Sequence, residues 1–264
     1  MKNIPIINLE TGRLILKKPT IDEQFALWNI LKEEKVNRYY FPTPDRIFIK
    51  NNLKKDNIYD LKKARKIFME QLSDWNRQKP FYDNKILDIL NEEPNQKYTW
   101  SIFLRTNEPI GQITVQPQEK YPNNPEVRNV GWFIDPKYQG NGYATEAAFA
   151  VLNFMFNSVE IEKVETSAAI INQGSWKIME KLGFERVGEY QSTYFDEDDN
   201  ILMSYCYVGN KENFNNSYNN YKKEEQWLGE FIWKSVRIVM LKWLNALVFI
   251  QIMLVELNLK NKYF

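Results

Sequence analysis

The sequence contains no histidine and only one cysteine, Cys206, among its 264 residues. A single thiol cannot build a disulfide framework, and the lack of imidazole excludes zinc sites made of His and Cys as well as serine–histidine triads. Neither sign of charge is in excess, because 35 Lys and Arg face 34 Asp and Glu. This balance excludes a whole-chain attraction to nucleic acid or to an acidic membrane. Any catalysis must use carboxylates, hydroxyls, amines or backbone groups.

Long apolar runs are also missing. Residues 1–20 mix charged and apolar side chains and have no apolar core of signal-peptide length, so a reducing, cytoplasmic setting is expected. The longest uncharged run, Trp243 to Val255, has about 13 residues, against about 20 for a membrane-spanning helix. Hydrophobic residues still make up 44% of the chain, which is ordinary for a folded globular protein.

The N-terminal part begins with a strand pattern and a helix-start signal. Arg13–Lys17 has the alternation of a strand, and Thr20 followed by Glu23 has the spacing of a capping box that opens a helix. Residues 42–97 are charged and interrupted, with helical periodicity from residue 61 to 75. We interpret this stretch as helical cover over a substrate cleft.

The second part alternates strands and helices. Helices are predicted from Ala144 and over Ser175–Leu182, the latter closed by Gly183. Strand patterns cover Tyr98–Leu104, Ile110–Val115, Val127–Ile134, Lys163–Ala168, Phe184–Glu189 and Leu202–Val208. The order predicts an α+β or three-layer α/β domain that ends near residue 210, with helices flanking a central sheet of about six to seven strands.

A glycine-containing loop over residues 135–142 joins one of these strands to the helix from Ala144. A helix N-terminus has unpaired amides and a partial positive charge, so such a loop can bind a pyrophosphate. Gly140 and Gly142 allow positive φ and a close approach of phosphate oxygens, and the amides of residues 139–145 can converge on the anion. Taken alone, so short a motif is more often a plain helix-entry turn.

The surroundings of the loop favour the functional interpretation. Gln139-x-x-Gly142-x-Ala144 matches the motif Q/R-x-x-G-x-G/A, and Asn172-x-x-Ser175 with Leu182-Gly183-Phe184 follows about 30 residues later. Through these motifs, residues 8 to 210 resemble the GNAT superfamily of N-acetyltransferases. The string from Ile134 to Ala147 is similar to the branch of ribosomal-protein N-terminal acetyltransferases and related enzymes that act on small amines.

The resemblance implies the GNAT fold, acetyl-CoA as co-substrate and no metal. The mixed sheet would splay between the strand ending at Ile134 and the strand Lys163–Ala168, and the pantetheine arm would lie in the gap. A backbone amide near Phe133 and Ile134 would stabilise the oxyanion, and Lys137 is a further candidate phosphate contact. The implied cofactor-binding residues are Phe133, Ile134, Gln139, Gly140, Asn141, Gly142, Tyr143, Ala144, Thr145, Asn172 and Ser175.

The implied reaction is direct attack of a primary amine on the thioester within a ternary complex. Ser175 is the candidate proton donor to the thiolate, although a serine there can equally cap its helix. Glu165 is a candidate base acting through water, or simply a strand residue that faces solvent. Tyr194 occupies the position at which a related branch member has a glutamate. Met179 stands where other branches have a catalytic tyrosine, so that route is absent.

The C-terminal part is expected to be an addition to the domain. We expect residues 211–226 to form a polar linker and residues 227–264 an apolar, helical tail. The tail would dock on its own domain, on a second protomer in a homodimer, or peripherally on a membrane interface. The amine acceptor is a protein N-terminus or a small molecule. The alternative function is a noncatalytic acyl-CoA-binding or membrane-associated interaction module.

Overall fold

The computed structural model describes the chain in separate ranges. These are residues 4–20, 97–195 without 119, 122 and 123, 201–227, and the positions 23, 26, 27, 29, 30, 35, 36, 230 and 240; for 193–195 and 201 only the backbone is described. The expected cover over 42–97 and most of the tail lie outside them. The chain divides into two compact units, Met1–Ser217 and Tyr218–Phe264. The description below concerns the first unit.

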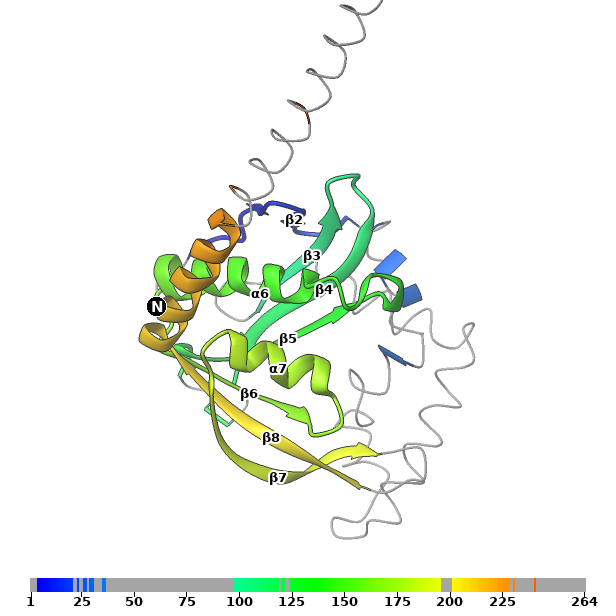
Figure 1. Ribbon diagram of the computed structural model, residues 1–264. Helices are drawn as coiled ribbons and strands as arrows, with labels where there is room; N and C mark the ends of the chain where they lie inside the picture. The colour runs from blue at the N-terminus through cyan, green and yellow to red at the C-terminus, as the bar shows by residue number, and fades with distance from the viewer. Residues whose placement is uncertain are drawn as a thin grey trace, which may run out of the picture. The chain divides into compact units, whose positions relative to one another are not determined.

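An eight-stranded mixed sheet forms the centre of this unit (Figure 1). Its spatial order is β1-β2-β3-β4-β5-β6-β8-β7, and β5–β6 is the parallel pair. The two-residue β1, which the sequence pattern did not predict, brings the count above the expected six to seven. The strands are β1 Leu9–Glu10, β2 Leu14–Lys17, β3 Tyr98–Leu104, β4 Pro109–Pro117, β5 Val127–Ile134, β6 Lys163–Ala169, β7 Glu185–Phe195 and β8 Ile201–Asn210.

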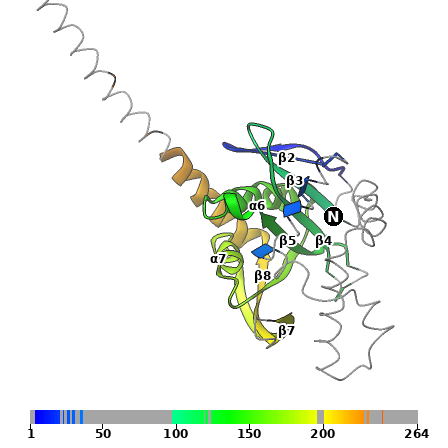
Figure 2. The ribbon, with the colours of Figure 1, turned by 90° about the vertical axis from the view of Figure 1, so that its right-hand side faces the viewer.

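Two helices cover one face of the sheet, as the turned view shows (Figure 2). They are α6, Tyr143–Phe154, and α7, Gln173–Lys181, and a π-helical turn, Met155–Val159, continues α6. The Phe154 ring lies edge-on to Trp100, with centroids 5.8 Å apart, and both residues are buried. The predicted helical spacing from Ala144 onward is confirmed, because this periodicity turns one apolar stripe toward the sheet.

The opposite face of the central strands is polar. Thr99, Ser101, Gln112 and Thr114 are all buried there, and their positions alternate with apolar residues that face the helices. The Thr99 and Thr114 hydroxyls lie 3.3 Å apart across β3 and β4. Because period-two alternation separates the two faces of a strand, this part of the sheet has one apolar face and one face of buried polar side chains.

The predicted capping box is confirmed. The Thr20 amide donates to a Glu23 carboxylate oxygen at 2.9 Å, and the Glu23 amide donates to the Thr20 hydroxyl at 3.3 Å. These reciprocal bonds satisfy two amides that the helix itself cannot pair. Among the described residues that follow, Leu27, Ile30 and Val36 are buried, as expected of an amphipathic helix.

The segment predicted as a polar linker is helical over residues 211–227. Within the first unit its Phe214 side chain is fully buried and packs against Phe149 and Phe156, with ring centroids 6.0 and 5.2 Å away. One aromatic anchor thus holds a segment whose average composition is polar. None of the helices in the described ranges has both the length and the apolar character that a membrane span needs. The domain boundaries and the docking of the tail stay predictions.

Candidate active site

The sheet opens between β5 and β6, as expected. Only the first residues of the two strands pair, Val127 with Lys163 and Arg128 with Val164. Beyond that point the pairing is replaced by side-chain bonds, because the Thr166 hydroxyl donates to the Val130 carbonyl at 2.9 Å. The two strands therefore diverge toward their carboxyl ends, and the gap leaves backbone groups on both sides unpaired by a neighbouring strand.

The backbone groups of β5 that face the gap follow from strand alternation. The Val130 carbonyl points to β6, because it accepts the Thr166 hydroxyl. The Phe133 carbonyl points to β4, because a Cβ on Gly111 of β4 would overlap its oxygen. Because backbone directions alternate along a strand, Trp132 and Ile134 face the gap. Of the two residues named for the oxyanion amide, Ile134 is the one whose backbone faces the opening. The Phe133 and Ile134 side chains are both buried.

The glycine loop between β5 and α6 is open to solvent. Residues 139–142 are exposed, Gly140 and Gly142 have φ of 79° and 78°, and Gly142 is the N-cap of α6 without a side-chain cap. The first α6 bond runs from the Glu146 amide to the Gly142 carbonyl at 3.0 Å. The amides of Tyr143, Ala144 and Thr145 therefore have no intrahelical acceptor and face the loop.

Side-chain donors hold the carbonyls of this loop. Asn141 Nδ2 donates to the carbonyls of Tyr138 and Gln139, at 3.1 and 3.2 Å. Because the C=O and N–H of a trans peptide point in opposite directions, the next amides, of Gln139 and Gly140, point away from the Asn141 side chain. Successive amides on one side of a loop form an anion-binding nest. The geometry favours the phosphate interpretation over a plain helix-entry turn.

The Gln139 side chain bonds within the protein. Gln139 Nε2 donates to the Ile134 carbonyl at 2.9 Å, so the side chain ties the loop to the end of β5. This bond positions the loop and leaves the backbone amide of Gln139 as the group that can contact an anion. Lys137 is exposed, and its amide donates to the Asp135 carboxylate at 2.9 Å.

The sequence interpretation missed an arginine at this loop. Arg13, just before β2, donates through Nη1 to the Asn141 carbonyl at 2.9 Å, and its guanidinium lies 4.7 Å from the centre of the Tyr143 ring. It also forms an ion pair with Glu146 of α6. No sequence signal links these residues, because they are more than 100 positions apart in the chain.

The second motif begins α7. Asn172 is the N-cap, without a side-chain cap bond, and its carbonyl accepts from the Ser175 amide at 3.0 Å. Ser175 therefore lies in the first turn, inside the helix, and the alternative that it caps α7 is wrong. Its side chain is partly exposed. Met179 is buried, consistent with a packing role at that position.

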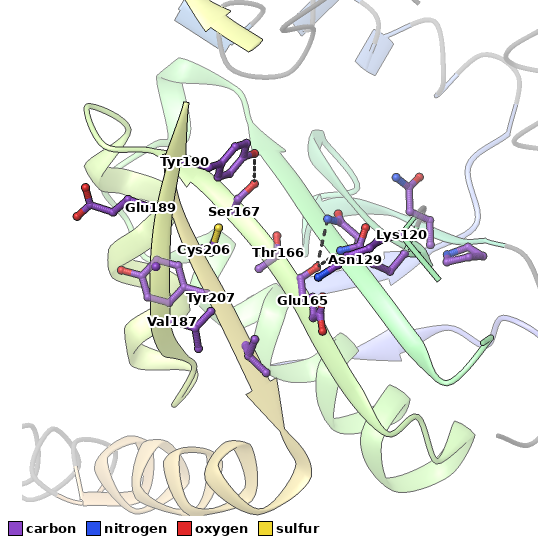
Figure 3. Close-up of a pocket in the computed structure, with 15 residues that line it drawn as sticks. Lys120, Asn129, Glu165, Thr166, Ser167, Val187, Glu189, Tyr190, Cys206 and Tyr207 are labelled. Atoms are coloured by element: carbon purple, nitrogen blue, oxygen red, sulfur yellow. Dashed lines mark hydrogen bonds between the residues drawn. The ribbon is translucent and has the colours of Figure 1, made fainter. Parts of the chain in front are cut away.

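A cavity of about 540 Å³ lies at the narrow end of the opening (Figure 3). It is lined by the end of β4 and by β5, β6, β7 and β8. The register pairs Ser167 with Cys206, and paired residues of antiparallel strands share one face. Its lining includes the side chains of Gln116, Asn129, Glu165, Ser167, Tyr190 and Cys206.

Polar side chains close the base of the cavity. Gln118 Nε2 and Asn129 Nδ2 both donate to the Glu165 carbonyl, at 2.9 and 3.3 Å. On the far side, the hydroxyls of Ser167 and Tyr190 lie 3.0 Å apart. Glu165 is therefore in the cavity, and Tyr190, which the sequence interpretation missed, lies beside it. The side chain of Tyr194, near the end of β7, lies outside the described residues.

Glu165 and Cys206, two of the titratable residues that line the cavity, have different constraints. The Glu165 carboxylate pairs with Lys163 Nζ at 2.8 Å, and this hydrogen bond raises the pKa of the lysine. Burial raises the pKa of the Cys206 thiol, so the thiol stays protonated at neutral pH. A protonated thiol is a poor nucleophile, so this raised pKa disfavours an acetyl-cysteine intermediate. Within the described ranges, no group of three or more Cys, Asp or Glu side chains is arranged to bind a metal ion.

The sequence matches the family model of the acetyltransferase (GNAT) domain over residues 13–185. This match spans β2 to the start of β7 and includes both the glycine loop and α7. The chain therefore belongs to the GNAT acetyltransferase family.

Two relatives from Bacillus subtilis (strain 168) are similar over part of their length. An uncharacterized N-acetyltransferase, YnaD, is 34% identical over 62 residues, which are 24% of this chain and 36% of the relative. The uncharacterized protein YkkB is 32% identical over 97 residues, 35% of this chain and 55% of the relative. The chain thus matches between about a third and about half of these curated relatives.

Solved structures share the fold at low sequence identity. An acetyltransferase of the GNAT family from Bacillus anthracis superposes with a TM-score of 0.53 at 17% identity, covering 78% of this chain and 99% of its own. A spermidine N-acetyltransferase from Vibrio cholerae, in complex with CoA and spermine, superposes with a TM-score of 0.54 at 14% identity, covering 77% of this chain and 99% of its own. A ribosomal-protein-S5-alanine acetyltransferase from Vibrio fischeri superposes with a TM-score of 0.51 at 14% identity, covering 79% of this chain and 99% of its own. The expected GNAT fold is confirmed.

Proposed function

We propose that this protein transfers an acetyl group from acetyl-CoA to a primary amine. The observation that carries this proposal is the exposed amide nest at the N-terminus of α6, directly beside the opening between β5 and β6. A diphosphate bound by the nest leaves the pantetheine arm free to enter the gap, where it can pair with strand backbone as an added strand does. The thioester then lies between the two strands beside the Ile134 amide, and the cavity lies farther along the gap toward its narrow end.

The chemical step is a direct attack within a ternary complex. The neutral amine attacks the thioester carbon, and the new oxyanion accepts a hydrogen bond from the Ile134 amide. The C–S bond then breaks, the thiolate takes a proton, and the nitrogen loses one to a base or to water. Ser175 is the proposed proton donor to sulfur, and Glu165 is the proposed base. Tyr194 stays a candidate on the sequence resemblance alone.

The cavity on the polar face is the proposed acceptor site. Its hydrogen-bonding groups, among them Gln116, Ser167 and Tyr190, suit the solvated head of an amine more than an apolar substrate. The acceptor is a protein N-terminus or a small-molecule amine. Relatives of the same fold are named for both kinds, a ribosomal-protein alanine and spermidine.

Release of free CoA thiol tests this function. With acetyl-CoA present, an accepted amine should accelerate thiol release at least tenfold over hydrolysis. The panel contains peptides that start with Ser or Ala, polyamines and aminoglycosides. A response to the peptides alone would assign a protein N-terminus as acceptor. CoA binding without accelerated release across the panel would favour the noncatalytic acyl-CoA-binding module instead.

Glu165→Gln is expected to lower kcat by about a hundredfold or more with little change in KM for acetyl-CoA, because a positioned base contributes roughly 10²–10⁴ in rate. Steady-state thiol release measures both constants. Lys163→Gln is the matched control, since it breaks the same 2.8 Å ion pair but keeps the carboxylate. Equal losses in the two variants would assign Glu165 to the ion pair alone and contradict its role as base.

A further inference from the structure

The first turn of α6 contains a buried carboxylate directly below the proposed phosphate site. Glu146 is only 3% exposed and stands one residue after the last unpaired amide of the helix. A negative charge in this turn suits the helix dipole when no ligand is present. It also repels a diphosphate bound a few ångströms away, so the charge must be compensated for the anion to bind.

The segment before β2 supplies this compensation. Oε1 of Glu146 accepts from the Thr11 hydroxyl at 2.5 Å and from the Arg13 amide at 2.9 Å. Oε2 accepts from Arg13 Nε at 2.6 Å, and Arg13 Nη2 lies 2.6 Å from the same oxygen. Four donors from one short turn therefore surround the carboxylate. The turn itself is fixed because the Leu14 amide donates to the Thr11 hydroxyl at 2.9 Å.

The same guanidinium also reaches the glycine loop. Arg13 Nη1 donates to the Asn141 carbonyl at 2.9 Å. In the trans peptide between Asn141 and Gly142, an inward carbonyl turns the Gly142 amide outward. Arg13 therefore sets the direction of one amide of the nest while neutralising the carboxylate beneath it.

We infer that Arg13 is a positioning residue for the diphosphate site, acting through Glu146 and the Asn141 carbonyl. This inference rests on the proposed function, because the ligand is the diphosphate of acetyl-CoA. Nε and Nη2 bond the Glu146 carboxylate and Nη1 bonds the Asn141 carbonyl, so the role assigned to the guanidinium is to shape the nest.

The first test compares Arg13→Met with wild type by calorimetric titration of CoA. The dissociation constant is expected to rise about tenfold to a hundredfold, since hydrogen bonds to charged groups contribute about 1.5–3 kcal/mol. Turnover of S-acetylpantetheine, which lacks the diphosphate, should stay within about twofold of wild type. Unchanged CoA affinity, or equal losses for acetyl-CoA and S-acetylpantetheine, would overturn the inference.

Arg105→Met is the matched control. Arg105 is 47% exposed against 50% for Arg13, and it forms an ion pair of 2.7 Å with Glu10 on the same N-terminal segment. Glu10, however, is 64% exposed, so this pairing is a surface interaction of small effect. Arg105 also donates to the Thr11 carbonyl, so the variant disturbs the same turn but removes no donor from the Glu146 carboxylate or from the Asn141 carbonyl. CoA affinity of this variant is expected to stay within twofold. A loss equal to that of Arg13→Met would make the effect a general one of the N-terminal strands and overturn the inference.

A double variant keeps the test decisive if Arg13→Met fails to fold. Arg13→Met with Glu146→Gln removes both charges, so the buried carboxylate no longer opposes the anion. We expect the double variant to fold. If Arg13→Met also folds, the double variant should bind CoA at least threefold more tightly than Arg13→Met. If Arg13→Met is unfolded, the double variant should still bind CoA at least threefold more weakly than wild type, because the Asn141 contact is lost. Affinity equal to wild type would overturn the inference. If wild type itself binds no CoA, both the proposed function and the inference fail. If wild type binds CoA and the Arg13 variants bind it with the same affinity, only the inference fails.

Discussion

Gly142→Glu is expected to weaken CoA binding by at least about a hundredfold, a loss of about 2.8 kcal/mol. Gly142 has φ of 78°, a left-handed conformation that costs a residue with a side chain roughly 1–2 kcal/mol. A carboxylate at the nest also repels the diphosphate. A Cβ at this position would lie 3.5 Å from Arg13 Nη2, so the new carboxylate competes for the guanidinium that holds Asn141. Calorimetric titration of CoA measures the loss.

Gly142→Gln separates charge from shape in this experiment. It has the same backbone strain and nearly the same volume as the glutamate variant but no charge, so a loss of about tenfold is expected. Thermal unfolding of both variants should show similar midpoints. If Gly142→Glu bound CoA as tightly as wild type, the anion site would not lie at this loop.

Gly111→Ala is expected to lower the free energy of unfolding by about 1–3 kcal/mol, the usual cost of overpacking a core. A Cβ there would overlap the Phe133 carbonyl oxygen and lie 2.8 Å from Ile134 Cδ1. Both contacts are with the end of β5, which forms one wall of the opening. The strand must shift, so KM for acetyl-CoA should rise as well. Urea denaturation and thiol release measure the two effects.

Gly131→Ala is the control for this change. Gly131 lies on β5 within the same strand pair, opposite Thr114, and a Cβ there would meet no heavy atom within 4 Å. The free energy of unfolding of the Gly131→Ala variant should stay within about 0.5 kcal/mol of wild type, because the added methyl group meets no crowded neighbour. Equal urea midpoints for the two variants would contradict the close approach of β4 to the end of β5.

Local signals made much of the fold predictable. β3 and β5 have the bounds that their alternating residues predicted, and the Thr20–Glu23 capping box has the two bonds that its spacing predicted. Such features depend on residues within a few positions of each other. The two-residue β1 has no pattern of its own, and it forms because β2 pairs with it.

The parts of the site that depend on distant pairing could not be predicted. The cavity exists because β8 inserts between β6 and β7, which brings Tyr190 and Cys206 beside Ser167. The Arg13–Glu146 pair likewise depends on how the N-terminal turn meets α6. By contrast, the backbone conformation at Gly140 and Gly142 was predictable, because glycine is the residue that adopts positive φ without steric cost.

Hydrogen–deuterium exchange of the glycine loop tests the central claim most directly. If main-chain amides bind the diphosphate, saturating CoA should slow exchange at the amides of residues 139–145, whereas pantetheine without the diphosphate should leave them unchanged. Bound CoA with no protection of these amides, or equal protection by pantetheine, would contradict the account.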